Sequence, residues 1–416
     1  MKRRLLSSAA AMSLMVATGC SITLGTPPEA GVSPTISQPI PSPSPQVTGV
    51  PAATGRIAVL DASGTLTVFD ADGSDPTFIA GSDPDVTLVR QPTWSRDGSR
   101  IAWVSLEADG TSATVMTAAP NGTRPTDTPV AAAPFYLSWD PTSSRIVYLG
   151  GSATADIELG LVDVAASTTA PIDAGSPFYF SWAPKGKQLL VHVGTDRLDR
   201  LAIDGTSTPV GDRPGTFSAP VWTADGRTLF YVSETEGRQR LVARDVATDR
   251  RETLARFDGV ITFVVSPDGE RVAYQVIEDG PVIAVPLSVI DRRSGTTDRV
   301  AAEYSPAFFW SPDGTKLLSL RPEVEGSLAF RWNVWEDGSS FSSDRFVPSL
   351  ELSRDYLQFF EQYAQSMTLW SPDGSAFVYA GQQVESGVSG IWIQAATIDT
   401  APVRVADGVV ASWSPG

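Results

Sequence analysis

Three acidic residues, Asp258, Glu303 and Glu361, stand in segments between predicted strands, where a pair of carboxylates could act on a substrate. Glycoside hydrolysis uses two carboxyl groups, a general acid and a base or nucleophile, at a separation of roughly 5 to 9.5 Å. A carbohydrate-active enzyme (a glycoside hydrolase or a lyase) or a glycan-binding module is therefore the alternative function that we keep for this protein.

The residue types that bind transition metals are almost missing. The chain has one histidine, His192, and one cysteine, Cys20. These counts exclude an intramolecular disulfide and a zinc or manganese site built from several histidines or cysteines. His192 lies in the alternating run Leu189-Leu190-Val191-His192-Val193, which predicts a packed strand residue. We expect no metal and no other cofactor.

Aromatic and basic residues precede several of the short predicted strands. Aromatic side chains beside polar groups suit the binding of a peptide or of a carbohydrate ring. The alternative is that they only pack between neighbouring sheets. The candidates are Arg90, Tyr136, Tyr179, Phe217 and Tyr304.

A longer segment between Trp310 and Trp370 supplies three more candidates, Tyr356, Phe360 and Tyr363. The run from Ser353 to Tyr363 has a serine suited to an N-cap and apolar residues at helical spacing. We therefore expect one helical insertion near residues 350–365. It would either form part of a binding site or plug the opening beside it.

The candidate residues belong to a chain that contains a sequence repeat, and this repeat predicts how they are arranged. Its clearest copies are Trp310-Ser311-Pro312-Asp313-Gly314 and Trp370-Ser371-Pro372-Asp373-Gly374, and successive copies are 45, 43, 40, 43, 45, 60 and 43 residues apart. A period of about 40 to 45 residues is the length of one four-stranded propeller blade. The copies begin at Trp94, Trp139, Trp182, Trp222, Val265, Trp310, Trp370 and Trp413.

The sequence Ser-Pro-Asp-Gly favours a tight hairpin turn. Proline suits the second position of a type I turn, aspartate tolerates the third, and glycine accepts the positive φ that follows. The repeated aspartates are therefore expected to be structural, and since they belong to separate blades they predict no metal site. They are Asp97, Asp225, Asp268, Asp313 and Asp373.

The fold class is all-β, with a single β-propeller over residues 55–416. Before Trp94 the chain has three strand-like runs but no first strand, and Val409 to Trp413 is a first strand with nothing after it. We predict eight four-stranded blades, closed by terminal strands that share one blade, because closure removes open sheet edges. Seven blades are the second choice.

The amino terminus carries an export signal. Lys2, Arg3 and Arg4 precede a short apolar run that ends at Ala17-Thr18-Gly19-Cys20. This ending resembles the lipobox of bacterial lipoproteins, which implies a signal peptide over residues 1–19 and lipid attachment at Cys20. Residues 20–54 are rich in Pro, Ser and Thr and predict an extended tether.

The repeat resembles the TolB-type, WD40-like propeller repeat, also called PD40, as in Trp370-Ser371-Pro372-Asp373-Gly374 followed by the strand Phe377-Val378-Tyr379. Relatives of this kind include adaptor proteins, non-catalytic domains of prolyl peptidases and certain lyases. The chain has no Gly-x-Ser-x-Gly motif for a peptidase and too few histidines for the metal site of the lyases.

From these observations we expect a non-enzymatic scaffold at the cell surface or in the periplasm. Lipidated Cys20 would hold it on the membrane, and the channel face of the propeller would bind a protein or peptide. The formal charge of −16 makes nucleic acid an unsuitable partner, since it repels phosphate.

Overall fold

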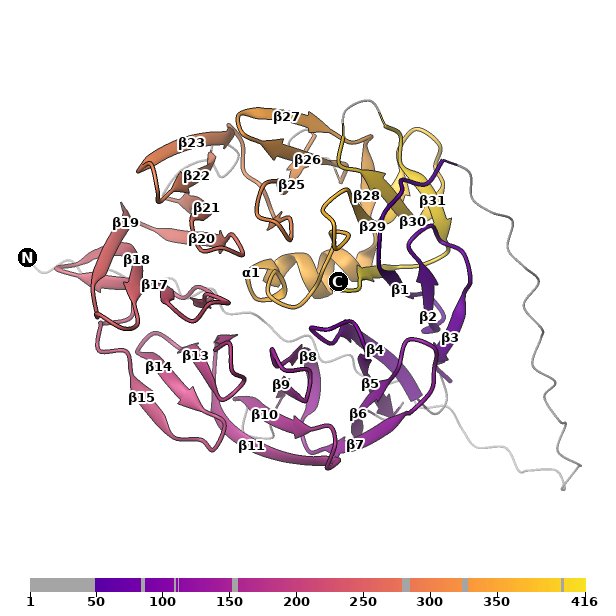
Figure 1. Ribbon diagram of the computed structural model, residues 1–416, viewed down its shortest axis with the longest axis horizontal. Helices are drawn as coiled ribbons and strands as arrows, with labels where there is room; N and C mark the ends of the chain where they lie inside the picture. The colour runs from indigo at the N-terminus through magenta and orange to yellow at the C-terminus, as the bar shows by residue number, and fades with distance from the viewer. Residues whose placement is uncertain are drawn as a thin grey trace, which may run out of the picture. The chain divides into compact units, whose positions relative to one another are not determined.

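The computed structural model describes residues 49–83, 87–107, 110, 112–151, 156–278, 285–323, 328–397 and 400–416. Their strands form antiparallel sheets, six of four strands and one of eight. Figure 1 shows the sheets arranged around a centre that holds α1. The all-β prediction is confirmed, and the predicted signal peptide, Cys20 and most of the tether lie outside the described residues.

The first sheet combines the two ends of the described chain. Strand β32 pairs antiparallel with β1, so that Ile57 is opposite Trp413 and Leu60 is opposite Val410. In order, its strands are β3 (Thr77–Ala80), β2 (Leu66–Asp70), β1 (Arg56–Leu60) and β32 (Val410–Trp413).

Each of the next five sheets consists of four consecutive strands. The first two are β4 (Thr87–Trp94), β5 (Ile101–Glu107), β6 (Ala113–Ala118) and β7 (Thr126–Val130), and β8 (Ala133–Trp139), β9 (Arg145–Gly151), β10 (Ile157–Asp163) and β11 (Thr168–Gly175). The third is β12 (Phe178–Trp182), β13 (Gln188–Val193), β14 (Arg197–Ala202) and β15 (Ser207–Pro209). The last two are β16 (Val221–Trp222), β17 (Thr228–Thr235), β18 (Arg238–Asp245) and β19 (Arg251–Phe257), and β20 (Val260–Val265), β21 (Arg271–Ile277), β22 (Leu287–Asp291) and β23 (Thr296–Ala301).

The eight-stranded sheet joins two copies of the repeat. Strand β28 (Phe346–Pro348) pairs with β26 (Phe330–Glu336) through Phe346 and with β29 (Ala376–Gln383) along its whole length. The other strands are β24 (Phe308–Trp310), β25 (Leu317–Pro322), β30 (Ser389–Ala395) and β31 (Val403–Ala406), with β27 (Ser339–Ser342) paired to β26.

The repeated turn is held by its own side chains. Ser311 Oγ donates to Asp313 Oδ1 at 2.6 Å and accepts from the Lys316 amide at 2.9 Å, while Asp313 Oδ1 also accepts from the Thr315 amide at 2.9 Å. Burial by itself would raise the pKa of Asp313, but the hydrogen bonds from Ser311 and Thr315 outweigh it and lower the pKa. The same three contacts recur with an aspartate at residues 97, 225, 268 and 373. The structural role predicted for these aspartates agrees with the geometry.

The tryptophan before the turn links neighbouring sheets. Trp139 Nε1 donates to Thr93 O at 3.2 Å, and Thr93 directly precedes Trp94, the equivalent tryptophan of the previous sheet. Trp94 repeats the contact with Ser412 O, which lies beside Trp413 in the first sheet, also at 3.2 Å. Trp310 and Trp370 make the same bond to Val264 O and Phe309 O. The indoles of Trp94, Trp139 and Trp310 thus set the position of their own sheet relative to the preceding one, and the bond of Trp370 joins the two halves of the eight-stranded sheet. Trp222 instead bonds to Gly226 O in its own turn, and Trp182 Nε1 has no partner among the described residues.

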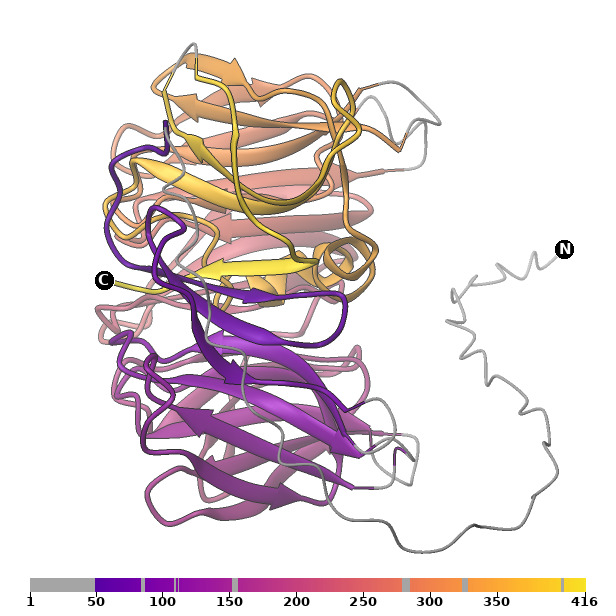
Figure 2. The same ribbon diagram turned by 90° about the vertical axis from the view of Figure 1, so that its right-hand side faces the viewer.

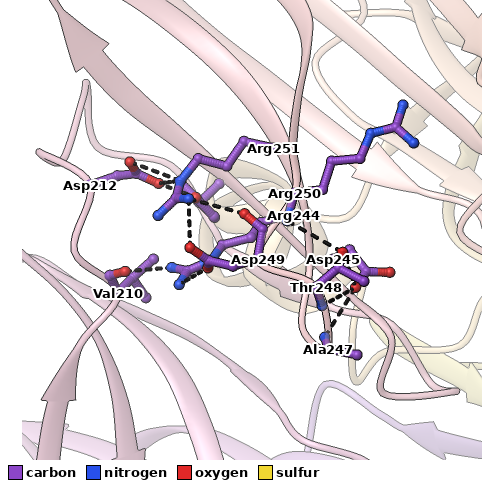
Figure 3. A network of polar contacts seen from close by, with 10 residues as sticks. Val210, Asp212, Arg244, Asp245, Ala247, Thr248, Asp249, Arg250 and Arg251 are labelled. Carbon is purple, nitrogen blue, oxygen red and sulfur yellow. Dashed lines mark hydrogen bonds and ion pairs between the residues drawn. The ribbon is translucent and has the colours of Figure 1, made fainter.

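An ion-pair network links the β15–β16 connection to the sheet of β16 to β19 (Figure 3). Arg251 lies between Asp212 and Asp249, at 2.8 and 2.9 Å, and Arg244 donates to Asp249 and to the Val210 carbonyl. The hydrogen bonds from Asp212 and Asp249 raise the pKa of Arg251. Because single exposed ion pairs contribute little to stability, we attribute to this network mainly the placement of the loop.

We expect Ser311→Ala to lower the free energy of unfolding by about 1 to 2 kcal/mol, because it removes two hydrogen bonds made by a buried hydroxyl. Urea unfolding of the full chain measures the change. Ser339→Ala is the matched control, since Ser339 is exposed in β27. Equal stability losses in the two variants would contradict a special role for the turn serine.

Candidate functional site

The insertion that follows β28 fills the centre of the ring of sheets (Figure 1). It consists of a π-helical turn, η2 (Leu352–Tyr356), a 3₁₀ turn, η3 (Leu357–Phe359), and the short α1 (Phe360–Tyr363). Figure 2 shows these helical turns toward the edge of the ring opposite to the C-terminus. The segment between residues 360 and 365 contacts six successive sheets through Gln91, Tyr136, Phe180, Pro220, Phe263 and Phe308.

The predicted helix exists in part. Ser353 lies inside the π-helical turn rather than at an N-cap, so that detail of the prediction is wrong. Ser349 has the capping role instead, because its hydroxyl accepts a hydrogen bond from the Leu352 amide at 3.1 Å. The apolar spacing was a better guide: Tyr356, Phe360 and Tyr363 are all buried.

Gln362 pairs with the open edge of β12. Its side-chain oxygen accepts from the Phe180 amide at 2.8 Å, and its side-chain nitrogen donates to the Phe180 carbonyl at 2.9 Å. These two bonds satisfy backbone groups that have no strand partner at the inner edge. The same side chain also meets the Tyr136 hydroxyl at 3.1 Å. The insertion therefore takes the place of a neighbouring strand at this point.

Tyr363 ties the insertion to two further sheets. Its hydroxyl lies 2.8 Å from Gln91 Oε1 and 3.0 Å from the Phe135 carbonyl. Its ring packs edge-on against Tyr136 at a centroid distance of 4.9 Å. Tyr136 and Tyr363 are 2% and 6% exposed, so they shape the channel from inside rather than line an open surface.

A pocket of about 310 Å³ lies beside the insertion, and we call it the Glu361 pocket. Apolar side chains of the insertion and of Pro306 form much of its wall. Six of its lining residues carry polar groups: Tyr179, Thr262, Tyr304, Ser353, Gln358 and Glu361. The Thr262 hydroxyl is buried and has no hydrogen-bond partner among the described residues. The pocket can therefore accept a ligand that is mostly apolar and carries a polar group.

Glu361 is the acidic group of this pocket. Its Oε1 accepts from the Phe263 amide at 3.1 Å, at the inner edge of β20. The residue keeps some accessible surface, but its carboxyl lies deep among aromatic side chains, and burial raises its pKa to about 8. At neutral pH most Glu361 carboxyls are consequently protonated and can donate a hydrogen bond.

Aromatic rings extend from one side of the pocket into the sheet of β12 to β15. Tyr179 stacks on Phe217 at a centroid distance of 4.6 Å, and Phe217 contacts the ring of His192 at 5.1 Å. His192 is 1% exposed, its Nδ1 lies 3.1 Å from the Ser218 carbonyl, and burial lowers its pKa. The predicted packing of His192 in a strand agrees with this position.

The remaining sequence candidates lie in different places. Tyr179, Tyr304 and Phe360 line the Glu361 pocket, while Phe217 stands behind Tyr179. Arg90 and Tyr356 line a separate cavity of about 480 Å³ between the insertion, β4 and the β1–β2 hairpin. The structure thus divides the predicted set between two cavities and the interior.

The three candidate carboxylates do not meet in this pocket. Asp258 is exposed, and Glu303 pairs with Arg321 at 2.9 Å. Of the three, only Glu361 contributes to the pocket wall. Within the described part of the chain, no cluster of three or more His, Cys, Asp or Glu side chains could hold a metal ion.

Thr262 and Gln362 are site residues that the sequence analysis missed. Thr262 stands three residues before Val265, as Tyr136 and Tyr179 stand three residues before Trp139 and Trp182. This position of the inner strand faces the channel in all three sheets, so the register of the repeat was a usable signal for Thr262. Gln362 had no such signal, because its partners come from other parts of the chain.

No model of a known protein family matches the chain. It is 38% identical over 64 residues to the Tol-Pal system protein TolB of Alcanivorax borkumensis, a match that covers 15% of this chain and 15% of that protein. Because the match spans so little of either protein, it leaves the function of the whole chain open.

Solved structures share the fold at low identity. A eukaryotic initiation factor is 12% identical, with a TM-score of 0.55, over 87% of this chain and 99% of that one. Prolyl endopeptidases are 11% identical, with a TM-score of 0.51, over 79% of this chain and 50% of theirs. TolB from Acinetobacter baumannii is 16% identical over 72% of this chain and 66% of that one, with a TM-score of 0.41. At such identities the likeness concerns the fold alone.

We expect Glu361→Gln to remove a pH dependence of stability. Because the pKa of Glu361 is about 8 in the folded state and 4.5 ordinarily, the folded state binds this proton more tightly. The resulting stabilisation is complete below about pH 4.5 and is lost as the pH rises to 8. Relative to Glu361→Gln, the wild type should lose on the order of 3 kcal/mol between pH 5 and pH 8 in urea unfolding, at about 1.4 kcal/mol per pKa unit.

Glu303→Gln provides the control for this measurement, because Glu303 is exposed and lies outside the pocket. It should follow the wild-type pH profile between pH 5 and pH 8. Parallel profiles for the wild type and Glu361→Gln would contradict the raised pKa.

Proposed function

We propose that this protein is an extracytoplasmic, lipid-anchored β-propeller that binds a peptide segment of a protein partner in the Glu361 pocket without chemical reaction. The observation that carries the proposal is the pocket itself, with aromatic walls, the Glu361 carboxyl whose pKa is raised to about 8, the unpartnered Thr262 hydroxyl, and the polar side chains of Ser353 and Gln358. These groups fit an apolar side chain together with the polar backbone next to it.

In this proposal the propeller has eight blades. The eight-stranded sheet counts as two, because each half contains one copy of the repeat and β28 only bridges them. The pairing of β1 with β32 and the bond from Trp94 to Ser412 would then close the ring. Such a closed and rigid disc offers a fixed pocket, which reduces the entropic cost of binding.

Exposed apolar residues support a protein partner. Phe135, Val260 and Leu350 are 45%, 46% and 66% exposed, although they are large and apolar. Phe135 lies in β8 and Val260 begins β20, two strands that contact the insertion, and Leu350 begins the insertion itself. A partner that enters the pocket could bury them as well. The short similarity to a Tol-Pal system protein is in keeping with a protein of the cell envelope.

The enzymatic alternative is less well supported by the geometry. Hydrolysis of a glycosidic bond by two carboxylates needs both beside the substrate. Among the described residues that line the Glu361 pocket, Glu361 is the one acidic side chain. We therefore propose binding rather than catalysis. We prefer a peptide to a glycan because Pro306, Leu320, Phe330, Leu357, Phe359 and Phe360 give the pocket an apolar wall beside its polar groups.

We expect that peptides selected from a random heptapeptide library for binding to this protein bind in the Glu361 pocket. We expect Tyr304→Ala to weaken their affinity at least tenfold in isothermal titration calorimetry, because it removes a wall of the pocket. Phe78→Ala is the control, since Phe78 is 63% exposed in β3, outside the pocket wall. Selected peptides that bind Tyr304→Ala as tightly as the wild type would argue against this site.

The anchor is tested separately. None of the helices in the described part of the chain is long and apolar enough to cross a membrane. If lipid on Cys20 holds the protein, Cys20→Ser should move it from the membrane fraction to the soluble fraction after cell disruption. Ser21→Ala is the matched control and should stay with the membrane. Retention of Cys20→Ser in the membrane fraction would overturn the proposed anchor.

A further inference from the structure

The repeated turns line one mouth of the ring. Two adjoining cavities lie there. Their volumes are about 370 and 290 Å³. Arg96, Val265, Pro267 and Ala364 line both of them, so the two spaces meet at Arg96. We call the pair the Arg96 cavity. The Glu361 pocket shares none of these residues and is a different site.

Arg96 departs from the repeat at the position where the other turns have a small or apolar residue. Its counterparts in the repeat are Pro141, Pro184, Ala224, Pro267, Pro312, Pro372 and Pro415, and all seven line one cavity or the other. A tight turn does not require arginine there, since proline serves in most copies. Arg96 is also the only residue with a formally charged side chain in the described lining of the two cavities, although Gly416, the last residue of the sequence, lines the smaller cavity and no ion pair joins it to Arg96 in the described structure.

The charge of Arg96 is not neutralised within the described structure. Its Nη2 donates to the Gln365 carbonyl of the insertion, which orients the guanidinium group. No carboxylate among the described residues lies within ion-pair distance of it, whereas 19 ion pairs hold other basic side chains. Asp140 is near, but its Oδ1 accepts from the Ser144 and Arg145 amides at 2.8 and 2.9 Å in its own turn.

We propose that the Arg96 cavity binds the C-terminal carboxylate of a peptide whose last residues are apolar. Arginine presents a planar fork of N–H donors that matches a carboxylate. Proline and tryptophan side chains, including Trp222 and Trp310, line the same cavities, and they suit the apolar residues that precede the carboxylate. The site would be selective, because the chain as a whole carries a charge of −16 and repels anions elsewhere.

The test compares two peptides that differ only in the charge of their end. N-acetyl-Pro-Leu as the free acid and as the amide are titrated into the full chain and followed by isothermal titration calorimetry. We expect the acid to bind at least tenfold more tightly than the amide, with a preference that shrinks as salt is raised. Arg96→Pro, which restores the repeat residue, should reduce the affinity for the acid to that for the amide.

Two variants complete the design. Arg96→Gln keeps the shape of the turn without the charge, and it replaces Arg96→Pro if that variant does not fold. Arg227→Gln is the control, since Arg227 follows the equivalent turn beside β17 and lines neither cavity. It should keep the preference for the acid. Equal binding of acid and amide to the wild type, no binding of either, or a preference that survives in both Arg96 variants would overturn the proposal.

Discussion

The packing of the repeat tryptophans between neighbouring copies of the repeat is the interaction on which the other features depend. An antiparallel sheet of four short strands leaves two faces exposed and is not stable by itself. Indoles such as Trp139 cover those faces. Where the N–H group also meets a carbonyl of the preceding sheet, as for Trp94, Trp139 and Trp310, that sheet has one position relative to its neighbour. Repetition of this contact leads the inner strands around a common centre.

That arrangement creates a problem which the insertion solves. Every inner strand has one edge without a strand partner, and its backbone groups face the centre of the ring. Gln362 satisfies Phe180 of β12, and Glu361 satisfies the Phe263 amide of β20. The segment is not one continuous α-helix, and its side chains reach the edges of several sheets. Its π and 3₁₀ turns adjust the direction of successive residues.

Both candidate sites follow from how the insertion fills the centre. On one side it leaves the Glu361 pocket, where burial among aromatic rings raises the pKa of the carboxyl to about 8. On the other side it leaves the Arg96 cavity, where the insertion supplies the Gln365 carbonyl and the repeated turns supply the wall. The chain therefore places the Glu361 carboxyl in one cavity beside the insertion and the Arg96 guanidinium group in another.

The sequence by itself determined the all-β class, the turn chemistry and the place of the insertion, because these depend on local residue types and on the spacing of the repeat. It also pointed to Tyr179 and Tyr304, which belong to inner strands or the loops before them. Only the tertiary structure decided that Tyr136 and Tyr363 are buried, that Glu303 pairs with Arg321, and that Gln362 reaches β12. Each of these outcomes depends on partners distant in the chain. Burial and the pKa of Glu361 are set by such partners, and local patterns do not record them.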